Sequence, residues 1–291
     1  MVPVLAQLAW YDVGDPASPE LDELAQRFGL HALQIEDCRH RPQRPKTEES
    51  GHYIFSVLKH IHQQGELEFE DVDVFLGTDF LITVRGSHCE WMEAVRARAE
   101  QERLDRLDRL FYMILDQIVD GYQPVLDKLA DEIADIEDVV LARPDPEILA
   151  QIFALKRRLV DFRRIAGGMR EVVNSLTRRE KGLLGDDLDI YFRDIYDHII
   201  RTVDLIETYR DLLSGALDIY LSAVANRTNE VMKLLTVWGT VALPLVIITG
   251  FFGMNLRLPW ANSVHGTVLA VGLMVVSTVA VLVYFRRKDW F

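Results

Sequence analysis

Residues 234–256, LLTVWGTVALPLVIITGFFGMNL, decide the fold, because they form a run of 23 residues without a formal charge. At about 1.5 Å per residue, a helix of this length covers roughly 35 Å, enough to cross the hydrocarbon core of a bilayer. A second uncharged run of 25 residues follows at 261–285, ANSVHGTVLAVGLMVVSTVAVLVYF. Both runs exceed the usual length of a buried core helix, so the sequence predicts two membrane spans.

The flanks of the spans predict their orientation. Arg286-Arg287-Lys288 follows the second span directly, and basic residues next to a span favour the cytoplasmic side. Two spans return the chain to the side on which it started. The N-terminus has no basic region followed by an apolar run, so we expect no signal peptide. We therefore expect a multi-pass protein of the cell (inner) membrane with both termini in the cytoplasm.

The charge distribution restricts the partners of the soluble part. The chain has 32 basic and 45 acidic residues, and residues 1–230 alone have 27 and 44. Such an acidic surface repels phosphates, which excludes DNA or RNA binding, and it attracts cations. The two cysteines, Cys38 and Cys89, indicate neither a disulfide framework nor a thiolate zinc site.

The first ninety residues predict a cytoplasmic α/β domain. Ser18-Pro19-Glu20 is typical of a helix start, and Gly29 of its end. Residues 53–62 and 72–84 are predicted strands, the second of which turns at 77–79.

Two histidines of the first predicted strand, His60 and His62, share one face and could hold a metal. Two histidines without a third ligand are more often ordinary strand residues, so we favour that interpretation.

Helical patterning takes over from residue 90. Residues 90–142 predict one long helix or two, bent near Gly121, and 147–181 predict the next. Asp186 begins a helix with no proline before Pro244. The predicted organisation is as follows: an α/β domain at 1–90, a cytoplasmic long-helix stalk at 91–230, a pore-lining transmembrane helix at 231–256, an outer loop at 257–263, a second transmembrane helix at 264–285 and a basic tail at 286–291.

A heptad pattern runs along the last helix. Its members are Asp197, Asp204, Asp211 and Asp218, continued by Ala225, Met232, Gly239, Val246 and Gly253. Apolar residues such as Ile199, Ile206 and Leu213 cover the other side and can pack on the preceding helices. A row of aspartates is usually a solvated face, but this one leads into the small-residue face of a membrane span. Several copies with this helix innermost would enclose an aqueous path for cations.

Several motifs resemble the CorA family of divalent-cation channels. They are Tyr191-Phe192-Arg193-Asp194, Tyr196-Asp197-His198, Asn229-Glu230-Val231-Met232-Lys233, and Gly253-Met254-Asn255 at the end of the first span. The resemblance covers about residues 127–291, and Arg44-Pro45-Lys46 resembles the family more weakly.

The resemblance implies an α+β membrane protein that forms a homopentameric funnel in the lipid bilayer. The long helix would line the pore, and Mg²⁺ would be both the transported and the regulatory ion, with Co²⁺ and Ni²⁺ able to pass. The implied roles are an outer selectivity ring for Asn255, supported by Gly253 and Met254; an apolar constriction for Met232, Leu235 and Leu243; polar pore positions for Asp218 and Asn229; and the stalk carboxylate of a regulatory magnesium site for Asp194. Glu70, Asp71 and Asp73 are guesses for the partner carboxylates.

Two departures from the family leave alternatives open. Residues 253–265 contain no acid, and Val246 and Phe252 stand where many members have Thr and Tyr. The alternatives are a Zn²⁺ transporter of the same architecture, with or without proton coupling, and a membrane-anchored scaffold or sensor without flux. The sequence has no Gly-x-x-x-x-Gly-Lys loop for ATP and no converging nucleophile, base and acid, so we expect no enzyme.

Overall fold

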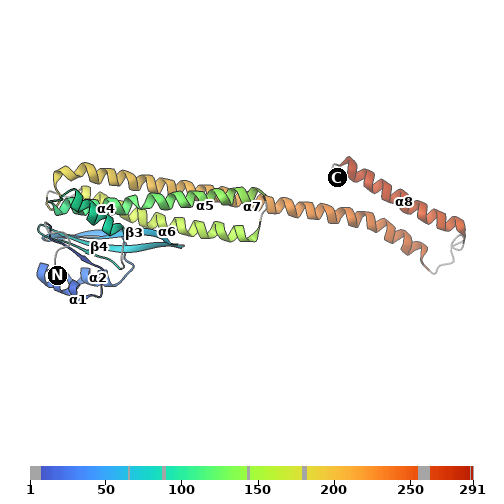
Figure 1. Ribbon diagram of the computed structural model, residues 1–291. Coiled ribbons are helices and arrows are strands. Elements are labelled where there is room, and N and C mark those ends of the chain that lie inside the picture. Colours follow the sequence, from blue (N-terminus) through green and yellow to red (C-terminus); the bar gives the residue numbers. More distant parts are fainter. Residues whose placement is uncertain are drawn as a thin grey trace. The chain divides into compact units, whose positions relative to one another are not determined.

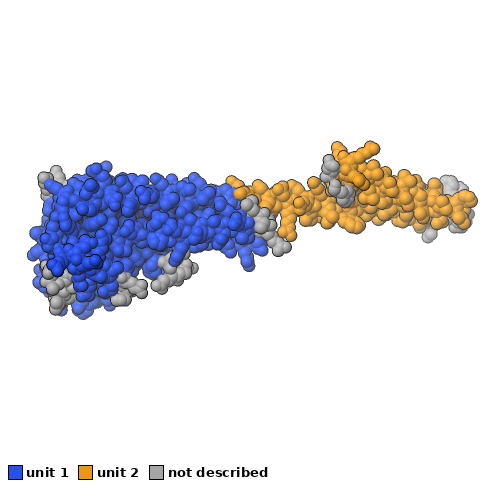
Figure 2. Space-filling view, turned by 45° about the horizontal axis from the view of Figure 1, so that its top comes forward, with its two compact units in different colours: residues 1–217 blue, residues 218–291 orange. Residues whose placement is uncertain are grey.

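The computed structural model describes residues 8–64, 66–86, 90–142, 145–178, 182–254, 263–288 and 290. The chain divides into two compact units, residues 1–217 and 218–291 (Figure 2). The elements of the first unit up to residue 188 are β1 (Trp10–Val13), α1 (Pro19–Phe28), α2 (Ala32–Arg39), β2 (Lys46–Ser50), β3 (Tyr53–Gln64), β4 (Glu66–Gly77), β5 (Leu81–Val84), α3 (Glu90–Gln101), α4 (Leu107–Asp120), α5 (Tyr122–Ala142), α6 (Pro146–Thr177) and a short 3-10 turn (Asp186–Leu188). Helix α7 (Asp189–Phe252) belongs to both units, and α8 (Val264–Arg287) to the second.

A five-stranded sheet forms the N-terminal part, in the order β1-β5-β4-β3-β2. Strands β1 and β5 are parallel, and the other neighbours are antiparallel. The predicted strands at 53–62 and 72–84 are confirmed as β3 and as β4 with β5. The structure also contains strands β1 and β2, which were not predicted. The predicted α/β character is confirmed.

Helices α1 and α2 cover one face of the sheet (Figure 1). Their apolar residues, among them Leu21, Leu24 and Ile35, are buried with Phe55 and Phe75 of the strands. As predicted, the Ser18 side chain accepts the Glu20 N–H at the start of α1. Gly29 ends the helix with φ 63°, a left-handed conformation that favours glycine.

Helices α4, α5 and α6 cover the other face (Figure 1). The buried Tyr122 hydroxyl of α5 donates a 2.7 Å hydrogen bond to the Lys59 carbonyl of β3. Helix α6 approaches the start of β2 closely at Gly168, where a Cβ atom would lie 2.9 Å from Pro45 Cγ. A side chain at this position would therefore push α6 away from the segment before β2.

Residues 90–142 form three helices, although the sequence predicts one or two. The additional break lies between α3 and α4, where Arg103 has φ 50°. The sequence has no glycine or proline at 101–107 to indicate this break. Arg106 holds the start of α4 by bonds to the Asp108 carboxylate and, at 2.9 Å, to Asp187. The bond to Asp187 thus joins the start of α4 to a residue distant in the sequence.

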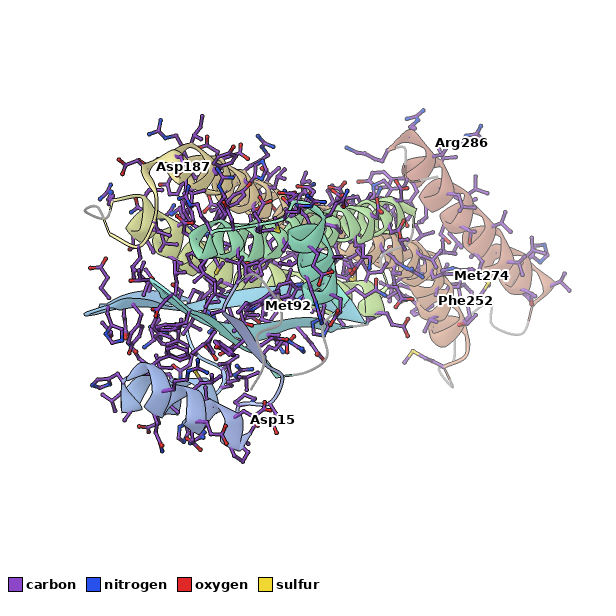
Figure 3. The ribbon with its side chains drawn as sticks, turned by 60° about the vertical axis from the view of Figure 1, so that its left-hand side comes forward. Asp15, Met92, Asp187, Phe252, Met274 and Arg286 are labelled. Carbon is purple, nitrogen blue, oxygen red and sulfur yellow. The ribbon has the colours of Figure 1, made fainter. Side chains whose placement is uncertain are left out.

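The second unit contains α8 and the C-terminal part of α7, the two helices that can span a membrane. Mean hydropathy reaches 2.0 in α7 and 2.5 in α8. The Ser263 hydroxyl accepts the Gly266 N–H at 3.2 Å and caps the start of α8. Figure 3 shows Arg286 at the C-terminal end of α8. These two long apolar helices confirm that part of the prediction.

Candidate functional site

Helix α7 has two faces of different character as far as residue 220. Phe192, Ile199, Ile206, Leu213 and Tyr220 recur every seven residues and are all buried. The aspartates of the predicted heptad, Asp197, Asp204, Asp211 and Asp218, are all exposed. The predicted division of this helix into a packing face and an acidic face is therefore confirmed.

The predicted pore positions continue along the same helix. Asn229 is exposed, and Met232, Leu235 and Leu243 are 56 %, 60 % and 61 % exposed in the single chain. Burying such apolar side chains in lipid or against other copies of the chain is favourable. Their exposure is compatible with the predicted constriction, which stays a prediction.

Threonine hydroxyls in the apolar part of α7 are satisfied within the helix. Thr236 donates to the Met232 carbonyl and Thr240 to the Thr236 carbonyl, both at 2.7 Å. Pro244 lacks an N–H, so the Thr240 carbonyl has no donor from the residue four positions later. The two threonine hydroxyls can thus lie within a span at limited cost, because the helix itself accepts their hydrogen bonds.

The turn after α7 is tight. The Gly253 N–H donates to the Thr249 carbonyl at 2.9 Å. A Cβ atom on Gly253 would lie 2.9 Å from the same carbonyl oxygen, so a side chain there would displace the turn. Met254 follows and is half exposed. Asn255 lies outside the described residues, so its position in a selectivity ring stays a prediction.

Asp194 lies in a cluster of three carboxylates and one imidazole from α4 and α7. We call this group the stalk cluster, and its members are Asp116, Asp120, Asp194 and His198. The Asp194 side chain is 67 % exposed, and Oδ2 lies 3.9 Å from His198 Nε2. The other ring nitrogen of His198, Nδ1, lies 3.7 Å from Asp120 Oδ1. Burial raises the pKa of Asp116, and the charge of Asp120 raises it further. The charges of this cluster would attract a divalent cation.

Asp116 and Asp120 belong to none of the motifs from which site residues were predicted. Their spacing of four residues, which places both on one face of a helix, was the available signal. Two of the guessed partners of Asp194 are wrong. Asp71 is buried and binds Lys59 Nζ and the Gln43 N–H. Asp73 is buried against Arg41 at 2.7 Å, so neither carboxylate can face a neighbouring copy.

Comparison with known proteins identifies the family. Residues 6–287 match the model of the CorA-like Mg²⁺ transporter protein family. The "Cobalt/magnesium transport protein CorA" of Thermotoga maritima is 38 % identical over 281 residues, which are 93 % of this chain and 79 % of that protein.

Solved structures agree with this match. "The complete structure of CorA magnesium transporter from Methanocaldococcus jannaschii" has a TM-score of 0.88 at 27 % identity, covering 98 % of this chain and 92 % of that one. The full-length CmaX protein shares the fold, with a TM-score of 0.78 at 21 % identity over 100 % of this chain and 91 % of that one. With a soluble α/β part, a long helix and two apolar C-terminal helices, the chain belongs to the CorA-like Mg²⁺ transporter family.

Proposed function

We propose that this protein is a passive channel for Mg²⁺, with Co²⁺ and Ni²⁺ as further permeant ions. The observation that carries the proposal is the exposed face of α7, which has aspartates in the first unit and small, polar and apolar residues within the span. A polar face on a membrane helix is costly against lipid. It is favourable where several helices enclose water. The names of the relatives from Thermotoga maritima and Methanocaldococcus jannaschii support magnesium and cobalt as the ions.

The pore would form from several copies, because one chain with two spans cannot enclose a channel. Family resemblance supports five copies with α7 innermost. The aspartate heptad would then line a water-filled cavity on the cytoplasmic side and concentrate cations there. Met232, Leu235 and Leu243 would form apolar rings that block ions by dewetting when the helices are close.

Ion entry would depend on the end of α7. Carbonyl groups at a helix C-terminus carry partial negative charge, which is favourable for a cation. A ring of Asn255 amide oxygens would add neutral, hard ligands. Because Mg²⁺ gives up its water reluctantly, such a ring would hold the hydrated ion without trapping it.

The membrane potential would supply the driving force. A divalent ion that crosses 100 mV gains about 4.6 kcal/mol, twice the value for a single charge.

Regulation would use the stalk cluster. Asp116, Asp120 and Asp194 repel one another, and Mg²⁺ bound near them, with several of its waters, would offset this repulsion. Carboxylates of a neighbouring copy would complete the site. At low cytoplasmic Mg²⁺ the site would empty, and repulsion would favour an open arrangement of the helices. The transported ion would thus close its own channel.

Flux into proteoliposomes tests this proposal. The purified protein is reconstituted, and uptake of Mg²⁺, Co²⁺, Ni²⁺ and Zn²⁺ is measured under an imposed potential and, separately, an imposed pH gradient. We expect uptake of Mg²⁺ that follows the potential and ignores the pH gradient. Zn²⁺ uptake driven by the pH gradient would instead support the Zn²⁺ transporter, and no flux of any ion would support a scaffold or sensor.

A further inference from the structure

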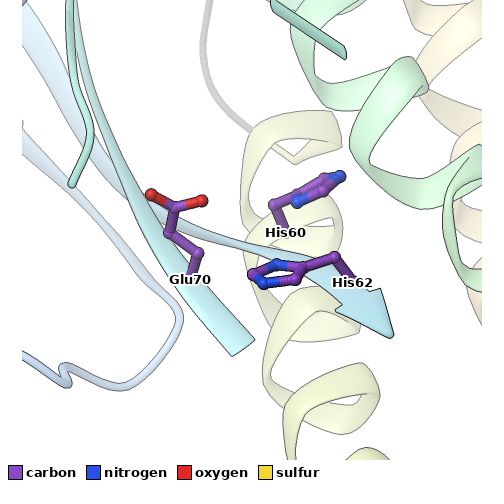
Figure 4. Close-up of side chains that lie close together, drawn as sticks. All are labelled: His60, His62 and Glu70. Atoms are coloured by element: carbon purple, nitrogen blue, oxygen red, sulfur yellow. The ribbon is translucent and has the colours of Figure 1, made fainter. Parts of the chain in front are cut away.

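Three potential metal ligands converge on the sheet of the first unit. His60 and His62 lie two residues apart on β3, and Glu70 lies on β4 directly opposite His60. One ligand atom from each residue lies within 4.8 Å of the other two. Figure 4 shows the two imidazole rings side by side, with the Glu70 carboxylate facing them from the neighbouring strand.

The surroundings hold His60 in place. Its ring stacks on Trp91 of α3, with centroids 4.8 Å apart. A Cβ atom on Gly121 would lie 3.8 Å from His60 Nε2, so this side of the ring faces the end of α4. The other nitrogen, Nδ1, is buried and makes no hydrogen bond among the described residues. A buried nitrogen without a partner is costly, and a metal ion is one group that can satisfy it.

The other two ligands can adjust. His62 and Glu70 are both partly exposed, and His62 Nε2 lies 3.3 Å from Glu68 Oε2 on the solvent side. Glu70 Oε1 accepts the Gly86 N–H at 3.1 Å, and a carboxylate oxygen can accept such a bond while its group binds a metal. Metal–nitrogen bonds of about 2.0–2.1 Å require ligand atoms roughly 3.4 Å apart. Small side-chain rotations of these two residues would close the cluster to that size.

We propose that His60, His62 and Glu70 form a binding site for a first-row transition metal ion of the Zn²⁺ type. Two imidazoles and one carboxylate suit Zn²⁺, Co²⁺ or Ni²⁺, whereas Mg²⁺ prefers oxygen ligands. A neutral imidazole is the form that binds a metal. Water can complete the coordination from the exposed side of His62. The site is thus chemically distinct from the acidic face of α7, and it would let the protein bind a transition metal in the presence of excess Mg²⁺.

Equilibrium dialysis of the full-length protein in detergent tests the site. Zn²⁺ is titrated in the presence of millimolar Mg²⁺, which occupies oxygen-donor sites, and bound zinc is counted per chain. We expect wild type to bind one high-affinity Zn²⁺ per chain, and His62→Gln and Glu70→Gln to bind it at least about 10-fold more weakly, because loss of even a supporting residue costs that much.

The matched control is His198→Gln, which removes the histidine of the stalk cluster. We expect this variant to bind the high-affinity Zn²⁺ as wild type does. No such binding by wild type, equal binding by His62→Gln and Glu70→Gln, or loss in His198→Gln instead would overturn the proposal.

A second readout uses the stacking of Trp91 on His60. Co²⁺ at the site should quench Trp91 emission, and the quenched fraction should fall in Trp91→Phe and in His62→Gln. Quenching that is the same in all three proteins would place the bound Co²⁺ elsewhere.

Discussion

Replacing Asp194 by asparagine should weaken the response of the stalk to Mg²⁺ while keeping the shape of the side chain. Asp194 and Asp120 lie on either side of His198, at 3.9 and 3.7 Å from its two nitrogens. A cation bound in the stalk cluster would interact with both carboxylates. Asp194→Asn removes one of these attractions without creating a cavity.

The size of the effect follows from Coulomb's law. A Mg²⁺ ion that keeps its water shell lies about 4.5 Å from a carboxylate oxygen, and their attraction is about 1.8 kcal/mol at the dielectric constant of water. This value applies because Asp194 is 67 % exposed. Salt with a Debye length of about 8 Å reduces the attraction to about 1 kcal/mol. The Mg²⁺ concentration needed to saturate the cluster should therefore rise between about 6- and 20-fold.

Limited proteolysis of the full-length protein measures this change. The Mg²⁺ concentration that gives half-maximal protection is compared between wild type, Asp194→Asn and Asp194→Lys, in which we expect still less protection. Glu171→Gln is the control, because it removes the same charge from an exposed position on α6. Protection of Asp194→Asn at the wild-type concentration would refute the assignment of Asp194 to the sensor.

Four further variants test other parts of the structure. Asn255→Ala should abolish selective divalent uptake and leave the assembly intact; wild-type flux and ion preference would contradict the selectivity ring. Met232→Gly should raise leak at high internal Mg²⁺, and unchanged leak would place the gate elsewhere. Gly253→Ala should lower flux, because its Cβ would meet the Thr249 carbonyl at 2.9 Å, and normal flux would show that the turn adapts. Lys59→Met should destabilise the protein by about 3–5 kcal/mol in denaturant unfolding, since it leaves the Asp71 carboxylate buried without its cation; a loss below about 1 kcal/mol would show that the ion pair contributes little to stability.

Local signals in the sequence predict much of the fold. Ser18 and Gly29 mark both ends of α1 because caps act within a few residues. The two apolar runs and the heptads of α7 are equally local. The break at Arg103 has no glycine or proline to mark it, and the neighbouring ion pair between Arg106 and Asp187 joins residues distant in the sequence. Contacts of this kind cannot be read from periodicity.

The same distinction applies to the candidate sites. The family motif in the sequence identifies Asp194. Its neighbours Asp116 and Asp120 lie on α4, which the Phe111–Phe192 ring contact helps to hold against α7. Glu70 reaches His60 because Gln64 and Glu66 pair at the hairpin, which fixes the register of both strands. A shift of one residue would turn Glu70 to the other face. The third ligand therefore depends on a register that the strand pattern alone does not specify.

Helix α7 extends well beyond the part of it that other elements of the same chain bury. Its buried heptad stops at Tyr220, and none of its residues from 221 to 252 is buried in the structure. These residues extend over about 48 Å, whereas the hydrocarbon core measures about 30 Å. Lipid can cover apolar positions such as Trp238 and Ile247, but Asn229 follows the acidic heptad on a face that lipid does not suit. We infer that further copies of α7 cover this face, because they share its polarity and can keep it in contact with water and ions.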